Sequence, residues 1–453
     1  MTKQSRIIAA LLTCFVISTL PIGCARSVQS IEAARGSYAI GDLSAAQETL
    51  AEISDRGGRF ADAAELDLAM VELAAGNPAS AEARLRKLRD RFDSQPKLTP
   101  VREAASMVTD DTARIFRAAG YEQVMIRTML AVCSLATDQV DAESYSLQAA
   151  MKQTELAREA EERGILDVAK VYQPIAFAPY LRGMLREATH HDYDDAAKAY
   201  QLVSAVRPQY APAQADIQRA SVGTHSAPGH GVLYVIACVG RGPVLQEATA
   251  DTTSTALSIA STVLNAETNK EETEDGDRVD GPVLPNIAAV KVPQVVVPPS
   301  DVAAIGVRVG GALYGATQTL TDVGELAITQ QQAEMPWTIA RAVVRRATKE
   351  AAVATVGDSL GLEGTAGSLF HFAAASAWSG SENADTRCWG MLPREIQVFR
   401  AELPIGEHPV EIQPLGFTGA AIAASQARTV SIHDGSNHYM VVLAPTATTY
   451  LVP

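Results

Sequence analysis

The sequence predicts an α-helical repeat array followed by an α+β domain with a small antiparallel β-module. Apolar residues recur at three- and four-residue spacing from Ile31 to about Ala220, which is the period of an amphipathic helix. A stretch rich in Gly, Pro and Ser, from Ser221 to Gly231, interrupts that pattern. Beyond it, β-branched apolar runs bounded by turn residues indicate strands.

Composition limits the classes of function. The 453 residues allow two or three domains at roughly 100–200 residues each, and 47% hydrophobic content supports packed cores. The net charge of −14 argues against a nucleic-acid partner, because phosphate binding needs clustered Lys and Arg. One basic cluster, "ARLRKLRDRF", is interleaved with Leu85 and Leu88, which favours a solvated helix face. No cofactor is predicted.

The first 24 residues form a targeting segment. Lys3 and Arg6 precede the apolar run "IIAALLTCFVISTL", which has the length of a signal-peptide core rather than of a membrane span. The following "LPIGCA" is similar to the lipobox of bacterial lipoproteins, with Pro21 in place of the usual Leu. This similarity implies a lipoprotein-type signal peptide over residues 1–24 and lipidation of Cys24. The alternative is an ordinary signal peptide in which Cys24 occurs by chance.

Residues 25–222 contain related units. "ARGSYAIGDLSAAQETLAEI" and "DLAMVELAAGNPASAEARLRKL" superpose with Gly41 over Gly76, 35 residues apart, close to the tetratricopeptide (TPR) period of about 34. The clearest unit is "LRGMLREATHHDYDDAAKAYQLVSAVRP". In each unit a small residue lets two helices approach, and a Gly with a short polar residue makes the turn between them. The prediction is therefore a TPR-like α-helical solenoid.

A solenoid of this kind offers a concave groove to a protein partner. We assign the partner-binding face to Tyr38, Glu72, Tyr121, Arg127, Tyr180 and Arg182. The alternative is a helical spacer that packs only against the C-terminal domain. His190, His191 and Asp192 fall in a turn between helices, so we interpret them as solvated turn residues, and no metal site is predicted.

Residues 223–453 are expected to form the α+β domain. "VLYVIACVG" is predicted as a buried strand, with "GPVLQEA" as a possible hairpin partner, and "NIAAVKVPQVVVP" as an edge strand. Between them, residues 265–281 are acidic and lack apolar anchors, which indicates a loop. The best helix of this half runs from Met335 to Ala354, with Pro336 near its start. The last eighty or so residues alternate and turn like a small antiparallel β-module.

Two motifs raise the question of catalysis. The tetrad "GDSL" contains Ser359, but a serine nucleophile needs a strand-to-helix turn and a correctly spaced base. We interpret Gly357 as a helix stop, with Asp358 and Ser359 as cap residues for the next segment. That segment, residues 360–378, is apolar and rich in small residues, and is expected to be a buried helix or a hairpin that touches the membrane.

The second motif is "ADTRCW". Its structural interpretation is an ion pair between Asp385 and Arg387 with Trp389 packed beneath it, and the alternative is a Cys–His–Asp hydrolase built from Cys388 and His408. Outside the signal region the remaining cysteines are Cys133, Cys238 and Cys388. An oxidising envelope permits a Cys238–Cys388 bridge, but spacing alone does not assign it. We predict no catalytic residue.

The succession of motifs resembles a family of bacterial envelope lipoproteins with TPR-like repeats. The resemblance rests on "YEQVMIRTMLAV", "APYLRGMLREATHHDYDDAAKAY", "GHGVLYVIACVGRGPV" and "ADTRCWGMLPREIQVFRAELPIGEHPVEI". It implies a cell-envelope location, facing the periplasm or the exterior, and a binding or assembly role. We therefore expect a non-enzymatic scaffold, anchored to a membrane through Cys24, for protein–protein interaction with envelope or cell-wall proteins. The alternatives are a cryptic serine or cysteine hydrolase and a cell-wall glycan-binding module.

Overall fold

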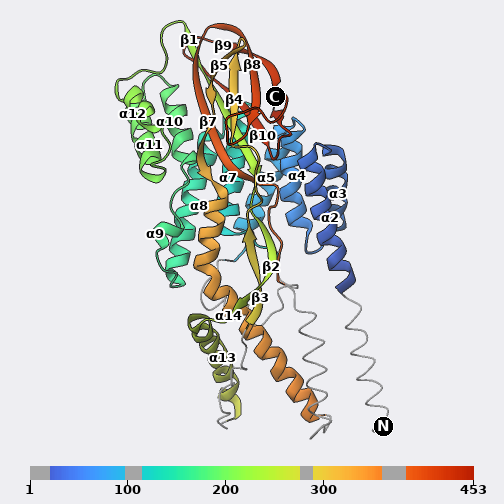
Figure 1. The fold of residues 1–453 in the computed structure, drawn as a ribbon. Helices are drawn as coiled ribbons and strands as arrows, with labels where there is room; N and C mark the ends of the chain where they lie inside the picture. The colour runs from blue at the N-terminus through green and yellow to red at the C-terminus, as the bar shows by residue number, and fades with distance from the viewer. Residues whose placement is uncertain (1–20, 97–114, 276–288, 360–383, 453) are drawn as a thin grey trace.

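The protein begins with packed helices. A computed structural model describes residues 21–96, 115–275, 289–359 and 384–452 (Figure 1). The helices of the first half are α2 (Pro21–Ile40), α3 (Leu43–Arg56), α4 (Ala61–Ala74), α5 (Pro78–Asp93), α7 (Gly120–Leu135), α8 (Ala142–Glu162), α9 (Val168–Val171), α10 (Phe177–Glu187), α11 (Tyr193–Val206) and α12 (Ala213–Ser221). The predicted order, a helical half followed by an α+β half, is confirmed.

The related units pack as their sequences require. Gly41 and Gly76 end helices with φ of 100° and 81°, a conformation that favours glycine over residues with a Cβ. Asp42 caps α3 by accepting a hydrogen bond from the Ala45 N–H at 3.0 Å. The small residues at the predicted crossings are all buried: Ala34, Ala46, Ala69 and Ala81. The turn chemistry and the small residues therefore position each helix on the next.

The described residues of the second half form three sheets. Its strands are β1 (His230–Arg241), β2 (Val244–Asp251), β3 (Ala289–Val296), β4 (Ala304–Val309), β5 (Ala312–Ala316), β6 (Gln318–Asp322), β7 (Pro393–Pro404), β8 (Gly406–Leu415), β9 (Gln426–Ile432), β10 (Asn437–Ala444) and β11 (Tyr450–Val452). The orders are β11–β10–β1–β7–β6, β5–β4–β8–β9 and β2–β3. The central strand β1 pairs antiparallel with β7 and parallel with β10.

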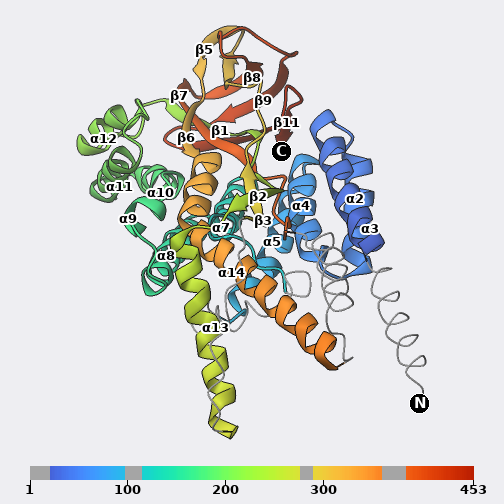
Figure 2. The ribbon, with the colours of Figure 1, turned by 60° about the horizontal axis from the view of Figure 1, so that its bottom comes forward.

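The five-stranded sheet lies between the helices and the four-stranded sheet (Figure 2). Because side chains alternate along a strand, Tyr234 and Ile236 of β1 face the helices, whereas Leu233 and Val235 face the four-stranded sheet. Both faces are covered, which explains why "VLYVIACVG" is apolar throughout. One hydrophobic core joins the helices to β1, β7 and β10, so it continues across the predicted domain boundary at residues 222 and 223.

Two long helices project from this body. α13 (Ser254–Asp275) and α14 (Val323–Ser359) pack together through small and branched residues and extend toward the same end of the molecule (Figures 1 and 2). The 37 residues of α14 correspond to about 55 Å at a rise of 1.5 Å per residue. No helix in the described part of the chain combines the length and apolar composition that crossing a membrane requires.

Several local predictions are wrong. α14 begins at Val323, not at Met335, because Asp322 caps it by accepting from the Glu325 N–H at 2.8 Å; Pro336 therefore lies inside the helix. Gly357 does not end it, since α14 continues to Ser359. Part of the expected acidic loop, up to Asp275, belongs to α13.

Strand pairing also differs from expectation. β2 does not form a hairpin with β1 but pairs with β3 in its own two-stranded sheet, where β3 is an edge strand as predicted. The C-terminal strands do not form a separate antiparallel module. β7 and β10 complete the central sheet on either side of β1, and β10 runs parallel to it. Alternation along these strands predicts which side chains are buried, but it carries no information about the neighbouring strand.

Candidate functional site: a groove between helices

The described residues contain an apolar groove of about 750 Å³ between α8 and α10. We call it the α8–α10 groove. Its lining comes from the turn before α8, from α8, from the segment before α10, and from α10 and α11. Its apolar members include Val140, Leu147, Ala150, Ala157, Ile175, Ala178, Pro179 and Leu202. Val140, Leu147 and Leu202 are 76%, 57% and 45% exposed. Large apolar side chains that stay open to solvent within one concave surface are typical of a binding site.

Polar side chains of α8 hold the floor of the groove in place. Ser146 donates a hydrogen bond to the Ala178 carbonyl at 2.7 Å, which fastens the first turn of α10. Gln153 accepts from the Ile175 N–H at 3.0 Å and donates to the Gln173 carbonyl. The bonds of Gln153 satisfy backbone groups of the segment before α10, which have no helical partner. The groove is therefore a built feature of the helical array rather than a loose gap.

The rim of the groove carries paired charges. Arg186 forms ion pairs with Glu143 at 2.6 Å and with Asp192 at 3.0 Å. Arg182, which is half-exposed, pairs with Asp195 at 3.2 Å. Exposed pairs of this kind contribute little to stability, so a partner can exchange them for its own charges at small cost. The groove thus combines an apolar floor with a rim that carries the guanidinium groups of Arg182 and Arg186.

Most of the residues predicted to form the partner-binding face do not line the groove. Of the six assigned residues only Arg182 lines the groove, while the other five are buried: Tyr38, Glu72, Tyr121, Arg127 and Tyr180. Tyr38 stacks on Tyr450 with ring centres 5.7 Å apart, and Glu72 pairs with Arg84 at 2.7 Å. The prediction is wrong for these five, because their helices turn the side chains toward neighbouring elements.

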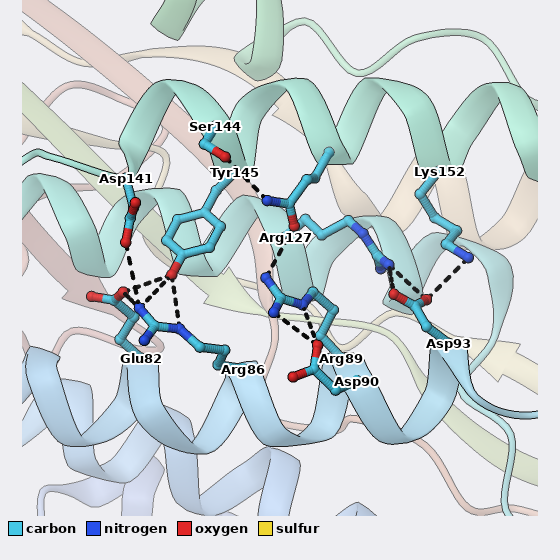
Figure 3. Close-up of polar contacts among 11 residues, drawn as sticks. Glu82, Arg86, Arg89, Asp90, Asp93, Arg127, Asp141, Ser144, Tyr145 and Lys152 are labelled. Carbon is cyan, nitrogen blue, oxygen red and sulfur yellow. Dashed lines mark hydrogen bonds and ion pairs between the residues drawn. The ribbon is translucent and has the colours of Figure 1, made fainter.

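Arg127 belongs to a polar layer between α5, α7 and α8 (Figure 3). Arg127 and Lys152 both point at Asp93, at 2.6 and 3.1 Å. In the same layer Arg86 donates to the Tyr145 hydroxyl at 2.7 Å, and that hydroxyl donates to Glu82 at 2.8 Å. The basic cluster of α5 is thus not simply a solvated face, because its arginines connect consecutive helices.

The "ADTRCW" block lies against the helical half. Arg387 forms the expected ion pair with Asp385, at 2.5 Å, and also donates to the Arg59 carbonyl at 3.1 Å. Its guanidinium stands over the Phe116 ring, 5.5 Å from the ring centre. Trp389 is fully buried. The block therefore connects the β half to helices that precede it by more than 250 residues.

A buried charged cluster completes this connection, and sequence reasoning did not find it. Arg35 of α2 donates to Asp67 of α4 at 2.8 Å and to the Cys388 carbonyl at 2.7 Å. Glu122 of α7 accepts from the Trp389 N–H at 2.6 Å. Burial raises the pKa of Glu122 to about 7, although the N–H groups of Trp389 and Ala119 act in the opposite direction.

Only glycine fits at position 390, beside this cluster. A Cβ there would lie 2.1 Å from the Arg35 Cζ atom, closer than any real contact. The order of the block, with Gly directly after Trp389, is therefore a packing requirement of the Arg35 guanidinium. We define these residues, Arg35, Asp67, Glu122 and Trp389, as the buried hub.

The three cysteines outside the signal region are buried and free, so Cys238 and Cys388 form no bridge. Burial raises the pKa of Cys238 and that of Cys388 to about 12, and it raises the pKa of Cys133 further. A thiol nucleophile needs the opposite shift. Cys388 instead accepts a hydrogen bond from the Leu245 N–H at 3.4 Å, and His408 contacts the Pro404 carbonyl.

We expect the three buried thiols to resist alkylation by iodoacetamide at pH 8 in the native protein. A pKa raised by three units lowers the thiolate fraction by about a thousandfold. Peptide mass spectrometry after timed labelling measures each site separately. In urea Cys133, Cys238 and Cys388 should all react quickly. Fast labelling of Cys388 alone in the native protein would contradict this expectation and would support the cysteine-hydrolase alternative.

The remaining motifs show no catalytic geometry in the described residues. Ser359 is the last described residue of α14 and is helical, not at the sharp turn that a serine nucleophile occupies; residues 360–378 lie outside the description. His190, His191 and Asp192 lie in the α10–α11 turn, and the described residues hold no group of three or more His, Cys, Asp or Glu placed to bind a metal ion. Tyr314 and Phe417, which a glycan-binding role would use, are exposed at the four-stranded sheet.

Cys24 lies in the first turns of α2, and its side chain is outside the description. Among the residues that line the groove, sequence reasoning missed Leu147 and Leu202. The sequence of α8 does indicate Leu147, because α8 carries apolar residues on two faces and only one of these faces is needed to cover α7.

Comparison with known proteins gives no significant match to a protein-family model, a curated protein or a solved structure.

Proposed function

We propose that this protein is a lipid-anchored scaffold of the bacterial envelope that binds a partner protein in the α8–α10 groove. Its helical half acts as a TPR-like solenoid, and Cys24 carries the lipid. The groove is the observation that carries the proposal, since it combines exposed Val140, Leu147 and Leu202 with an ordered floor. Its partner is a segment of an envelope or cell-wall protein that presents apolar side chains.

Two further observations support a solenoid with an anchor at one end. The 35-residue offset between the Gly41 and Gly76 turns is close to the TPR period. In both ribbon views α8, α10 and α11 lie on the opposite side of the molecule from α2, where Cys24 is found (Figures 1 and 2). A membrane at Cys24 therefore leaves the groove accessible to a partner.

Substitution of Leu147 or Leu202 by Glu is expected to reduce partner capture by about tenfold or more. Burying a leucine contributes about 1.5–3 kcal/mol, and about 1.4 kcal/mol corresponds to tenfold in affinity. The measurement is photo-crosslinking from position 150, at the centre of the groove, in intact membranes, followed by quantification of the crosslinked partner. Point substitutions are preferable to deletion of the helical half, because deletion would expose the sheet face that packs against it.

Leu313→Glu is the matched control, because Leu313 is equally exposed but lies on β5, away from the groove. It should leave crosslinking unchanged. Cys24→Ser should release the protein from the membrane while purified protein still binds the isolated partner. Equal crosslinking by the groove variants and the control would overturn the groove assignment. Membrane retention of the Cys24→Ser protein would overturn the anchor.

A further inference from the structure

Histidines gather where the helical half meets the β half. Of the eight histidines in the sequence, six lie at this junction in the described part of the chain. They are His190 and His191 in the α10–α11 turn, His225 in the linker to β1, His230 at the start of β1, His433 in the β9–β10 turn and His438 at the start of β10. Three separate segments thus bring titratable groups to one contact.

Direct hydrogen bonds close this contact. His190 Nε2 lies 2.7 Å from the Gly435 carbonyl, to which it donates. Asn437 donates to the Met184 carbonyl of α10 at 3.1 Å, and the Gly229 N–H donates to Asp434 at 2.9 Å. His190 has a φ of 62°, a left-handed conformation that a residue with a side chain adopts at some cost. The contact with the β9–β10 turn compensates for that cost.

The hydrogen bonds require specific protonation states. Asn437 uses its amide N–H groups for Met184 and for the Tyr439 hydroxyl, so its oxygen accepts from His225 Nε2 at 2.8 Å. His438 Nε2 accepts from the His433 N–H at 3.0 Å. A protonated imidazole has N–H groups on both nitrogens and cannot accept. The bond from the His433 N–H, which orders the β9–β10 turn, therefore needs a neutral His438.

Like charges would also meet on protonation. The rings of His190 and His225 are 4.9 Å apart, and those of His433 and His438 are 5.4 Å apart. Burial lowers the pKa of His225, which is 2% exposed, and burial with the His433 charge lowers the pKa of His438. The closed junction therefore favours the neutral forms of both.

The charged groups that face the junction do not neutralise these histidines. Arg400 of β7 donates to the His225 carbonyl at 2.6 Å and adds positive charge. Glu187 of α10 is the nearest buried anion, but Arg219 of α12 already pairs with it at 2.5 Å.

At the outer side of the junction the carboxylates are likewise engaged. Asp192 binds Arg186 and lies 3.6 Å from His191, while Asp434 accepts from Gly229. Glu402 of β7 accepts from the Ala227 N–H at 2.8 Å. None of these bonds leads to the His190–His225 or His433–His438 pair. Glu187 favours the protonated form of His225, but burial has the larger effect and lowers its pKa.

We propose that this junction is an acid-sensitive latch, in which protonation of His438 removes the acceptor of the His433 N–H and loosens the β9–β10 turn that holds the α10–α11 turn. The pKa of His225 and that of His438 are about 6.5 when the junction is open and lower when it is closed. Closing is therefore favoured most above about pH 6.5 and less as the pH falls below it. An envelope protein experiences such changes, because the space outside the inner membrane follows the pH of the surroundings.

Opening of the junction would also change the rim of the α8–α10 groove. Arg186 at the groove rim pairs with Asp192 in the latch turn, so a shift of that turn alters the rim. This consequence rests on the proposed function, whereas the opening itself does not. A measurement of opening in the protein without a partner therefore tests the latch even if the groove binds nothing.

Amide hydrogen exchange of the full mature protein at pH 7.5 and 5.5 measures the opening. After correction for the intrinsic pH dependence of exchange, protection of the α10–α11 and β9–β10 turns should fall by up to about tenfold, because pH 5.5 is one pH unit below the pKa of His438 in the open junction. Protection of α3, which is remote from the junction, should not change. Equal protection of the two turns at both pH values would overturn the proposal.

The double variant His190→Gln/His438→Gln isolates the cause. Glutamine at 190 can still donate to the Gly435 carbonyl, and glutamine at 438 can accept from the His433 N–H at any pH. The variant should keep its protection at pH 5.5. His408→Gln, on β8 and outside the junction, is the matched control and should respond like the wild type. If the double variant loses as much protection at pH 5.5 as the wild type, the latch is contradicted. If that variant does not fold, the comparison of the wild-type protein at pH 7.5 and 5.5 tests the latch.

Discussion

Asp67→Ala is expected to lower the free energy of unfolding by about 3–5 kcal/mol, the cost of removing one partner of a buried ion pair. Asp67 has no exposed surface, and its two oxygens accept from Arg35 at 2.8 Å and from the Met391 N–H at 2.9 Å. The substitution leaves a buried guanidinium without its main carboxylate and a buried N–H without an acceptor. Urea unfolding followed by far-UV circular dichroism measures the loss.

Two further variants separate charge from packing. In the double variant Arg35→Met/Asp67→Leu the uncompensated charge is absent, so its loss should be smaller than that of Asp67→Ala. Glu52→Ala removes an exposed i,i+4 pair with Arg56 and should change stability little. If Asp67→Ala were no more destabilising than Glu52→Ala, the buried hub would not hold the two halves together.

Trp389→Ala is expected to cost about 3–5 kcal/mol, because it leaves a cavity where a fully buried aromatic side chain stood. Trp389 packs in the core that joins the helices to the central sheet. Since its backbone N–H also binds Glu122, the cavity opens directly beside the buried hub. The same unfolding measurement applies, with the slope of the transition checked for a change in cooperativity.

Trp389→Phe is the matched control. Within the described part of the chain the indole N–H has no hydrogen-bond partner, and a buried donor in that state is itself unfavourable. Phenylalanine removes the donor and keeps most of the apolar volume, so we expect a loss below about 1.5 kcal/mol. Equal losses for Ala and Phe would show that the indole shape, rather than burial, determines stability at this position.

Local features of the fold could be predicted from the sequence. The turns at Gly41 and Gly76, the small residues at the helix crossings and the buried strand β1 follow from backbone conformation and apolar periodicity. The Asp385–Arg387 ion pair could also be predicted, since a single position separates the two residues in the sequence. Each of these features depends on residues that are close in the chain.

The candidate site was predicted only in part. Arg182 lines the groove as expected, but Tyr38, Glu72 and Tyr180 are buried. Periodicity identifies the apolar faces of a helix, and α8 has two of them. Which face is covered depends on where α10 packs, and the sequence of α8 does not contain that information.

The sequence is sufficient to predict a helical first half, a strand-rich second half and the apolar periodicity of each. Only the tertiary structure decided which elements meet: β2 with β3, β10 beside β1, Arg35 with the Cys388 carbonyl, and His190 with Gly435. The physical reason is that burial is a property of one segment, whereas a contact across 353 positions, as between Arg35 and Cys388, depends on the packing of every element between them.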